Sequence, residues 1–422
     1  MKKKIVYICA FSNKELRENL DLQSYDLGNK LRKWLGKPTI RREDYGPWNP
    51  QFIKGFEDDP NNEYFIICPH NGLRHKCQEF TIRGIHYFVY NWSVGVLNIF
   101  LKTIFNWEEK SDYIYYRKQI KKIIAEISPD LIVVGGAENP IYSWAAMDVP
   151  DSTPTFILLQ SLMNDPKRIA MGVSSPYRRS LESKILHKHH YFGVVEGCAK
   201  GYLLKENPKA IQFEIDYPCN NPCVVSQEKK YDFIFVAGGI TKNKGVEDVI
   251  KSMAIVHQTV PNATLNISGS IQSQYKEELQ NMIEKLKLQD VVSFQPAFAM
   301  ISDVYTHMTK ARCIVVPGIT AALNSTVKES MLLGLPTICY ETSVTPEINR
   351  EKECLITAKM EDIDDLASKM ANTISQPNWA NMVAKNGQIY AKKRFTADAI
   401  GIRLRNYFTS ILIQASNTNE ND

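Results

Sequence analysis

The stretch FVAGGITKNKGVEDVI, residues 235–250, decides the fold. Its apolar start is typical of a buried strand, and Val246 opens the apolar face of a helix. Between strand and helix lie Gly238, Gly239 and Lys244, followed by a third glycine. Glycines let a ligand approach the backbone, a helix start offers unpaired N–H groups, and a lysine can neutralise phosphate. The spacing matches neither Walker A nor GxGxxG, so a plain loop with a solvated lysine is the alternative.

Short apolar runs alternate with helical patterns on both sides of this stretch, which favours parallel sheets covered on both faces. The predicted strands before it are residues 4–9, 64–68, 85–89, 131–134, 155–159 and 192–195. Those in and after it are residues 232–237, 264–268, 291–294, 312–316 and 336–340. Two such arrays predict two doubly wound domains. Ligands of such sheets lie at the carboxyl ends of the strands, so a cleft between the domains is the natural site.

A second constellation, residues 317–349, reads PGITAALNSTVKESMLLGLPTICYETSVTPEIN. A loop of small residues leads into a helix that Asn324 or Ser325 can cap. Such a loop and the helix start, with the N–H groups of Ser325 and Thr326, fit a diphosphate. Glu329 lies about one turn inside the helix, where a carboxylate could accept paired sugar hydroxyls. The alternative is that Glu329 is an ordinary surface glutamate.

These two regions resemble the signature regions of the retaining glycosyltransferases of family 4, which have the GT-B fold. Their usual patterns are a strand followed by G-R-L-x-x-x-K-G, and an E-x7-E element that continues into E-A-M-A-x-G-x-P-V and a loop ending in P-E. The residues that align with these patterns are Gly238, Lys244, Gly245, Glu329, Gly334, Pro336, Pro346 and Glu347. The resemblance covers residues 231–395 well, and the first half only in the general order of its elements.

Three positions depart from the family pattern. Gly239 stands where the first signature has arginine, which removes an expected phosphate contact. Ala321 stands where E-x7-E has its first glutamate, which family members often use on the donor sugar. Gly135 stands at the end of an earlier strand, where a histidine is frequent, and Glu138 is the polar residue nearby.

The resemblance implies an α/β protein of GT-B fold, with two Rossmann-like domains that face a central cleft. Residues 1–216 would form an acceptor-binding domain, 217–230 a linker, and 231–395 a nucleotide-sugar-binding domain. A helix over residues 396–415 would pack back on the N-terminal domain, and residues 416–422 would be a disordered tail.

The implied activity is transfer of a hexose from a nucleotide-diphosphate sugar to a hydroxyl of a glycan or lipid-linked acceptor, with retention. The implied pathway is assembly of capsule, O-antigen or exopolysaccharide, with no cofactor and no metal. Lys244 and Glu329 would be catalytic, and the donor-binding set would be Gly238, Gly239, Lys244, Asn324, Ser325, Thr326 and Glu329. Candidates on the acceptor side are Ser12, Asn13 and Glu138. Because of the departures, an inactive GT-B partner subunit that binds sugar or nucleotide is the alternative, and a sugar-nucleotide epimerase is a third.

Composition sets wider bounds on the protein. A net charge of +5 over 422 residues permits an anionic ligand or a membrane surface and does not argue for nucleic acid. Nine scattered cysteines, an odd number, indicate reduced thiols. The apolar run after the basic start is too short for a signal peptide, so we expect a cytoplasmic protein.

Three segments suggest peripheral contact with the inner membrane face. Residues 91–107 are strongly apolar but too short to span a bilayer, and residues 31–42 and 117–122 are basic. The alternatives are a core helix and solvated helix faces. Residues 187–190, HKHH, are either metal ligands or a polar helix end.

Overall fold

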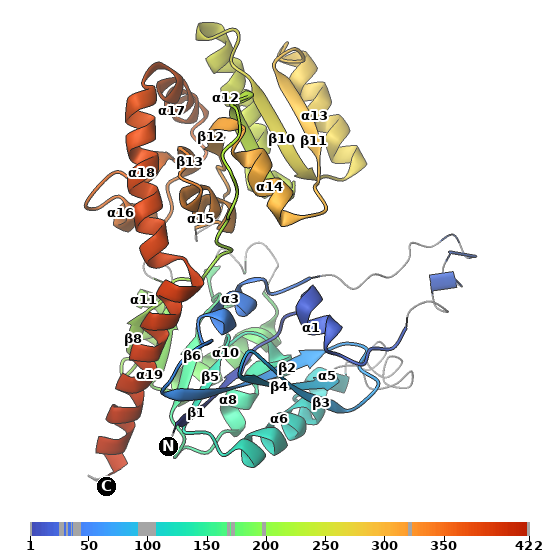
Figure 1. Ribbon diagram of the computed structural model, residues 1–422, viewed down its shortest axis with the longest axis vertical. Helices are drawn as coiled ribbons and strands as arrows, with labels where there is room; N and C mark the ends of the chain where they lie inside the picture. Colours follow the sequence, from blue (N-terminus) through green and yellow to red (C-terminus); the bar gives the residue numbers. More distant parts are fainter. Residues whose placement is uncertain are drawn as a thin grey trace. The chain divides into compact units, whose positions relative to one another are not determined.

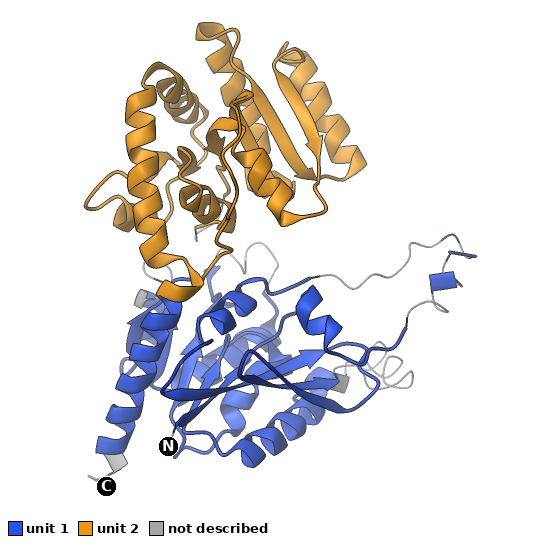
Figure 2. Ribbon diagram, in the orientation of Figure 1, with its two compact units in different colours: residues 1–217, 400–422 blue, residues 218–399 orange. Residues whose placement is uncertain are grey.

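The chain forms two compact units, and each is described by itself. The computed structural model describes residues 2–24, 29–30, 33–34, 36, 44–91, 107–166, 169, 174–195, 200–319 and 323–419. Unit 1 comprises Met1–Tyr217 with Ile400–Asp422, and unit 2 comprises Pro218–Ala399 (Figure 2).

Unit 1 is built on an eight-stranded sheet in the order β3-β4-β2-β1-β5-β6-β7-β8 (Figure 1). Its strands are β1 (Lys3–Ile8), β2 (Asn62–His70), β3 (Cys77–Ile82), β4 (Ile85–Asn91), β5 (Leu131–Val134), β6 (Thr155–Leu158), β7 (Tyr191–Val194) and β8 (Ile211–Glu214). Its helices are α1 (Lys14–Glu18), α3 (Trp48–Lys54), α5 (Trp107–Lys110), α6 (Ile114–Ile127), α7 (Pro140–Ser143), α8 (Ala145–Asp148), α10 (Pro176–Lys188) and α11 (Lys200–Glu206). The pairs are parallel except β3–β4, which is antiparallel.

Alternate residues of β1 enter two different cores, so both faces of this sheet are covered. Val6 and Ile8 pack with the apolar stripe of α6, whereas Ile5 and Tyr7 pack with residues of α3 and α19 (Ala397–Asn419). The chain runs from β1 to β2 on one side, and β5 lies on the other side of β1. The carboxyl ends of β1 and β5 therefore form the topological switch point, where open α/β sheets bind ligands.

The C-terminal helix α19 belongs to the core of unit 1 from residue 400 on. Ile400, Leu404, Phe408 and Ile411 are fully buried at helical spacing. A side chain at Gly401 would place its Cβ 2.2 Å from the carbonyl oxygen of Gly55, so glycine is needed for this close approach. The helix extends to Asn419 and so includes the first residues of the segment that we expected to be a disordered tail.

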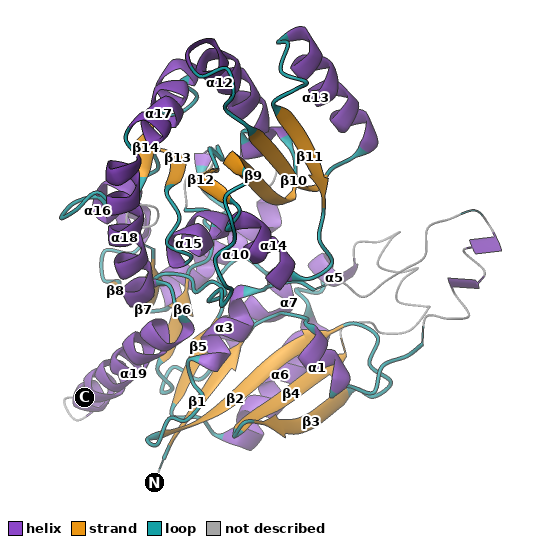
Figure 3. Cartoon of the chain, turned by 45° about the horizontal axis from the view of Figure 1, so that its top comes forward, coloured by secondary structure: helices purple, strands orange, loops and turns teal. Residues whose placement is uncertain are grey.

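Unit 2 is built on a six-stranded parallel sheet in the order β11-β10-β9-β12-β13-β14 (Figure 3). Its strands are β9 (Tyr231–Gly239), β10 (Leu265–Ser270), β11 (Val292–Pro296), β12 (Ala311–Val315), β13 (Thr337–Tyr340) and β14 (Ile356–Ala358). Its helices are η1 (Lys242–Lys244, a 3₁₀ turn), α12 (Val246–Thr259), α13 (Ser273–Lys285), α14 (Ile301–Met308), α15 (Ser325–Leu332), α16 (Thr345–Ile348), α17 (Ile363–Ser375) and α18 (Pro377–Arg394). The switch point of this sheet lies between β9 and β12, because the chain passes from β9 to β10 on one side and β12 lies on the other.

The prediction of two doubly wound α/β domains is confirmed, and every predicted strand is present within one or two residues of its ends or inside a longer strand. Three further strands, β3, β8 and β14, were not predicted. β3 is an edge strand whose side chains are half-buried or exposed, so it carries no buried apolar run. Its hairpin to β4 turns at Arg83 and Gly84, both with positive φ, as a two-residue turn of the I′ type requires.

Candidate functional site

The predicted donor loops of unit 2 meet at its switch point. Gly245, at φ +78°, sits so close to the segment after β12 that an added Cβ would lie 2.1 Å from the carbonyl oxygen of Pro317. The N–H of Ile319 also donates to the carbonyl of Asn243 at 3.0 Å. The loop after β9 and the loop after β12 therefore form one surface at the carboxyl edge of the sheet.

The two glycines that end β9 leave open space. Gly238 and Gly239 are exposed, and an added Cβ at either would meet no described atom within 4 Å. Packing within unit 2 therefore does not require glycine at these positions. The open space at Gly239 is where the family pattern has its arginine.

Two lysines of the η1 turn have different surroundings. The Lys242 ammonium lies 3.9 Å from a carboxylate oxygen of Glu278 and over the ring of Tyr275. Lys244 is half-buried, and among the described residues its ammonium has no hydrogen bond or ion pair. Lys244 is thus the cation of this turn that can meet an anionic ligand.

Asn324 caps α15 as predicted for that position. Its side chain accepts a hydrogen bond from the N–H of Thr326 at 2.9 Å, and its carbonyl accepts from Val327 and Lys328. The cap lies near the joined loops, since its Nδ2 is 3.8 Å from the Cβ position of Gly318. Ser325 is exposed. The Thr326 N–H, which we expected to donate to a diphosphate, is occupied by the cap here.

Glu329 is half-buried on α15 and has protein partners. Its Oε1 accepts a hydrogen bond from the hydroxyl of Tyr305 at 3.0 Å, and its carboxylate also accepts one from Asn220. Burial raises the pKa of Glu329 to about 7, although these two hydrogen bonds and the neighbouring Lys328 lower it. Among the described residues, no hydrogen bond or ion pair joins Glu329 to Lys244, and their joint role in catalysis stays a prediction.

A pocket of about 360 Å³ lies at the carboxyl ends of β10 and β11 and was not predicted. Its polar lining comes from Ser270, Ser273, Lys276 and Gln295, and the Lys276 ammonium lies 5.6 Å from the ring centre of Phe294. The signal was present in the segment GSIQS, residues 269–273, whose glycine and first serine directly follow the buried part of β10. Small hydroxyl residues at a strand end are typical of ligand loops.

At the switch point of unit 1, Ser12 and Asn13 have structural roles. The Ser12 hydroxyl accepts a hydrogen bond from Arg17 at 2.9 Å and lies 3.2 Å from Nε2 of His70, and the residue is buried. Asn13 caps α1 by accepting from the N–H of Leu16 at 2.8 Å. Both residues lie where an acceptor is expected, but their side chains are used within the fold.

Glu138 follows β5 at the same switch point and differs from Ser12 and Asn13 in its hydrogen bonding. Its side chain is buried, and its Oε2 has no hydrogen-bond partner among the described residues. Burial raises its pKa to about 7. A buried carboxylate oxygen without a donor is costly, and such groups gather at functional sites.

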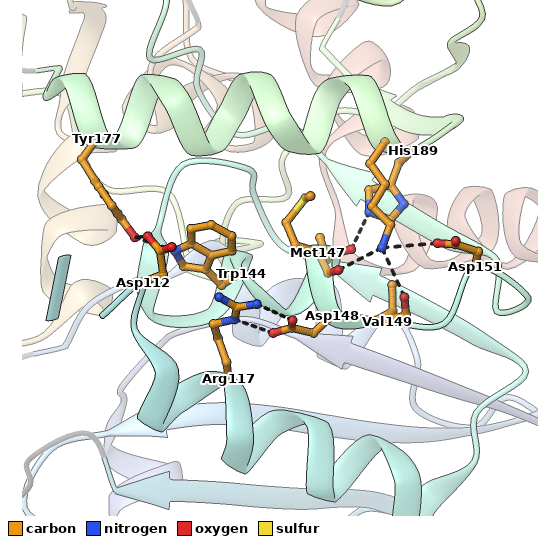
Figure 4. Close-up of polar contacts among 11 residues, drawn as sticks. Asp112, Arg117, Trp144, Met147, Asp148, Val149, Asp151, Tyr177 and His189 are labelled. Carbon is orange, nitrogen blue, oxygen red and sulfur yellow. Dashed lines mark hydrogen bonds and ion pairs between the residues drawn. The ribbon is translucent and has the colours of Figure 1, made fainter. Parts of the chain in front are cut away.

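His187 and Lys188 of the HKHH segment end α10, and His189 is its C-cap residue, labelled in Figure 4. The Lys188 ammonium donates to the carbonyls of Met147 and Val149 at 2.9 and 3.3 Å. His189 Nε2 donates to the Ala146 carbonyl at 2.7 Å, and burial lowers the pKa of this histidine to about 4. In the part of the chain that the structure describes, no cluster of three or more histidine, cysteine or acidic residues could hold a metal ion.

The segments that suggested a membrane contact lie mostly outside the described residues, namely 92–106 and most of 31–42. Residues 117–122 lie on α6, where Arg117 is paired with Asp148 by two hydrogen bonds. Among the helices that are described, none is both long and apolar enough to cross a bilayer.

Comparison with known proteins bears on these observations. Residues 224–390 match the family Glycosyl transferases group 1. An uncharacterized glycosyltransferase of Haemophilus influenzae is 23% identical over 293 residues, which cover 67% of this chain and 77% of that protein. The family match lies entirely in unit 2 and includes both predicted donor loops.

Solved structures resemble the whole chain in fold. Sucrose-phosphate synthase from Thermosynechococcus elongatus aligns with a TM-score of 0.66 and 14% identity, over 98% of this chain and 100% of that one. HepE from Anabaena, in complex with UDP and glucose, aligns with a TM-score of 0.61 and 13% identity, over 97% and 100%. These likenesses confirm the predicted GT-B fold, whereas assignment to family 4 stays a prediction.

Proposed function

We propose that this protein is a glycosyltransferase that binds a nucleoside diphosphate sugar at the switch point of unit 2 and transfers the sugar to a hydroxyl. The observation that carries the proposal is the junction of the two loops at Gly245 and Pro317. It gathers exposed backbone at Gly238 and Gly239, the Lys244 ammonium and the capped start of α15 at one edge of the sheet. The family match over these same residues supports it.

The proposed reaction depends on the negative charge that develops on the leaving diphosphate. When the bond from the anomeric carbon to the diphosphate breaks, the leaving group takes the electron pair and gains negative charge. A preplaced cation and backbone N–H groups lower the energy of that state. Lys244 is the described cation in position to do so, because its ammonium makes no ion pair with described residues whereas that of Lys242 contacts Glu278. No metal is required by this scheme.

Glu329 needs a rearrangement to serve the donor. In the structure its carboxylate accepts from Tyr305 and Asn220, and two sugar hydroxyls would have to replace or join those donors. An exchange of neutral donors around one carboxylate keeps its hydrogen bonds satisfied. We propose that Glu329 binds the ribose in this way and that the pocket at β10 and β11 holds the base.

The finer features of the reaction rest on the family resemblance. They are retention of configuration, a glycan or lipid-linked acceptor, a role in surface polysaccharide assembly, and a cytoplasmic location with contact to the inner membrane face. UDP-glucose is the first donor to test, since HepE, which shares the fold, is seen with UDP and glucose.

A second candidate is a binding subunit of the same fold that performs no transfer. Gly239 in place of arginine, the capped Thr326 N–H and the engaged carboxylate of Glu329 favour it. Such a subunit would bind nucleotide without turnover.

The experiment is calorimetric titration with UDP, GDP, dTDP and ADP, followed by transfer and hydrolysis assays with the matching sugar nucleotides, with and without membrane lipid extract. A transferase binds one nucleotide and turns over its sugar. Binding without turnover under any acceptor selects the second candidate. Failure to bind any of the four contradicts both.

A further inference from the structure

The segment of residues 218–230, which leads into β9, belongs to unit 2 and is fastened there at both ends. At its start, Cys219 is buried, and its N–H donates to the Phe395 carbonyl at 3.1 Å. At its end, the N–H of Lys230 donates at 2.8 Å to the carbonyl of the residue before β12. Between these ends, the backbone of residues 220–226 forms no hydrogen bond with any other described backbone group. The middle of the segment is therefore held by side chains.

The side chain of Asn220 joins this segment to Glu329. Its amide donates a hydrogen bond to the Glu329 carboxylate and is also hydrogen-bonded to the hydroxyl of Tyr305. The same hydroxyl donates to Oε1 of Glu329 at 3.0 Å. The carboxylate that is predicted to bind the ribose thus accepts hydrogen bonds from two neutral donors, a phenol and an amide.

These two donors differ in how firmly the protein holds them. Tyr305 lies on α14, is only 4% exposed, and packs in the apolar core that contains Val327 and Met331 of α15. Asn220 is half-buried, lies outside helices and strands, and precedes backbone without hydrogen bonds to described backbone groups. Moving the tyrosine would open the core, whereas moving the asparagine would not. Asn220 is therefore the donor that can be exchanged.

The chemistry of the ribose suits such an exchange. An ionised carboxylate can accept about four hydrogen bonds, and the two neighbouring hydroxyls of a ribose can donate to it together. Like the amide of Asn220, these hydroxyls are neutral donors. When they take the place of the amide, the Glu329 carboxylate keeps its hydrogen bonds, so that neither state leaves a half-buried charge without donors.

We propose that Asn220 occupies the place of the ribose hydroxyls on Glu329 and leaves it when the donor nucleotide binds, whereas Tyr305 stays and orients the carboxylate. This inference rests on the proposed function, in which Glu329 binds the ribose, and adds the residue that competes with the nucleotide for it. Asn220 then lowers the affinity for a nucleotide that carries both ribose hydroxyls. It does not affect a nucleotide that lacks them, because nothing displaces the amide.

The test is calorimetric titration of the full chain with UDP, GDP and ADP, each beside its 2′,3′-dideoxy form. Asn220→Ala is expected to bind the ribonucleotide that the wild type binds about 10-fold more tightly, the lower end of the worth of a hydrogen bond to a charged group. The dideoxy form is expected to bind both proteins equally. Tyr305→Phe is expected to weaken binding of the ribonucleotide, because the hydroxyl that orients the carboxylate is gone.

Asn221→Ala is the matched control. Asn221 is the next residue, is exposed, and its side chain forms no hydrogen bond within the described part of the chain. This variant is expected to bind every nucleotide as the wild type does.

A second measurement needs no nucleotide. In urea unfolding, the variant with both Asn220→Ala and Glu329→Gln is expected to lose less unfolding free energy than the sum of the two single losses, because both changes remove the same hydrogen bond.

Three results would overturn the proposal: Asn220→Ala binds the ribonucleotide no more tightly than the wild type, it gains as much for the dideoxy form, or the losses in urea unfolding are additive. Failure of the proposed function has a different signature, since the wild type then binds none of the six nucleotides. The inference falls with it in that case, and the unfolding data still report whether Asn220 and Glu329 are coupled.

Discussion

The two switch points of the molecule use the same topology for opposite chemistry. In unit 2 the strand ends carry glycines, a lysine without an ion pair among described residues and a capped helix start, a set that suits an anion. In unit 1 the strand ends carry a buried carboxylate, of which one oxygen has no hydrogen-bond partner among the described residues. The two sheets share a topology, and the side chains at their strand ends differ in charge.

Each unit also has a glutamate after the second strand of its switch point, buried in unit 1 and half-buried in unit 2, and the two differ in their partners. Glu329 accepts from Tyr305 and Asn220, whereas Glu138 is bonded to its own turn and keeps one oxygen unpaired among described residues. Burial raises the pKa of both to about 7.

The largest expected effect tests the anionic character of unit 2. Lys244→Ala is expected to lower the transfer rate by about 10²- to 10³-fold, as loss of one charge partner of a transition state does, and to weaken UDP binding. Lys242→Ala is the control, because that ammonium contacts Glu278 across an exposed surface and contributes little. Steady-state kinetics measures the transfer rate and calorimetry measures the affinity for UDP. Equal turnover in Lys244→Ala and wild type would contradict the assignment of Lys244 to the donor site.

The second effect tests whether the two donor loops act as one surface. Gly245→Ala puts a Cβ 2.1 Å from the Pro317 carbonyl at a positive φ, so it is expected to cost about 2–4 kcal/mol of unfolding free energy. The matched variant Gly238→Ala meets open space and is expected to change stability by less than about 1 kcal/mol. Urea unfolding measures the loss of unfolding free energy in both variants. Similar losses would contradict the inference that the two loops are in close contact at Gly245.

The third effect is the dependence of the unfolding free energy on the ionisation of Glu138 in unit 1. Since burial raises the folded pKa of Glu138 from 4.5 to about 7, the stability that the neutral form provides is complete below about pH 4.5 and is lost as the pH rises through about 7. Gln cannot ionise, so Glu138→Gln is expected to gain on the order of 3 kcal/mol at about pH 8 and little at about pH 4.

Unfolding curves at the two pH values give this difference directly. Glu182→Gln is expected to destabilise at both, because it weakens hydrogen bonds that a satisfied carboxylate accepts from Met163 and Asn164. If Glu138→Gln gains no unfolding free energy at about pH 8, the prediction is wrong. The folded protein then stabilises the ionised Glu138 carboxylate more than its described contacts indicate.

The sequence predicted the two sheets because both are buried on two faces, so their strands read as apolar runs. It predicted that the loops after β9 and β12 carry glycine, lysine and an N-cap residue at the sheet edge, and their binding of a donor stays a prediction. It could not show that Glu329 lies against Tyr305, or that Ser12 lies against His70, because those partners are 24 and 58 residues away in the chain.

Glu138 is a second residue whose surroundings could not be predicted from the sequence. Its position after a buried strand was visible in the sequence, but its burial, and an oxygen without a hydrogen-bond partner among the described residues, are seen only in the folded chain. The GG pair before it was the available signal, since two glycines at a strand end indicate an unusual turn.

The smallest expected effect tests whether the position of the Glu138 carboxylate depends only on its own turn or also on the helices packed behind it. Arg117 makes two hydrogen bonds to Asp148 at 2.7 and 2.6 Å and stacks 4.6 Å from the ring centre of Trp144, which joins α6 to the helix pair that follows Glu138 (Figure 4). Arg117→Lys keeps the charge but loses the planar stacking and one hydrogen bond, so about 1 kcal/mol of unfolding free energy is expected to be lost.

Lys184→Met is the companion variant, because its ammonium lies 5.3 Å from the centre of the same ring but forms no described ion pair. It is expected to lose less than Arg117→Lys in urea unfolding. Neither change is expected to alter the gain in unfolding free energy that Glu138→Gln shows at about pH 8, since the turn of Glu138 is fixed by its own glycines and by the Ser143 hydroxyl, which donates to the Gly136 carbonyl at 2.8 Å. A change of that gain by more than about 1.4 kcal/mol in the Arg117→Lys background, which corresponds to one unit in the pKa of Glu138, would show that the helices behind the turn, and not only the turn itself, hold the carboxylate in place.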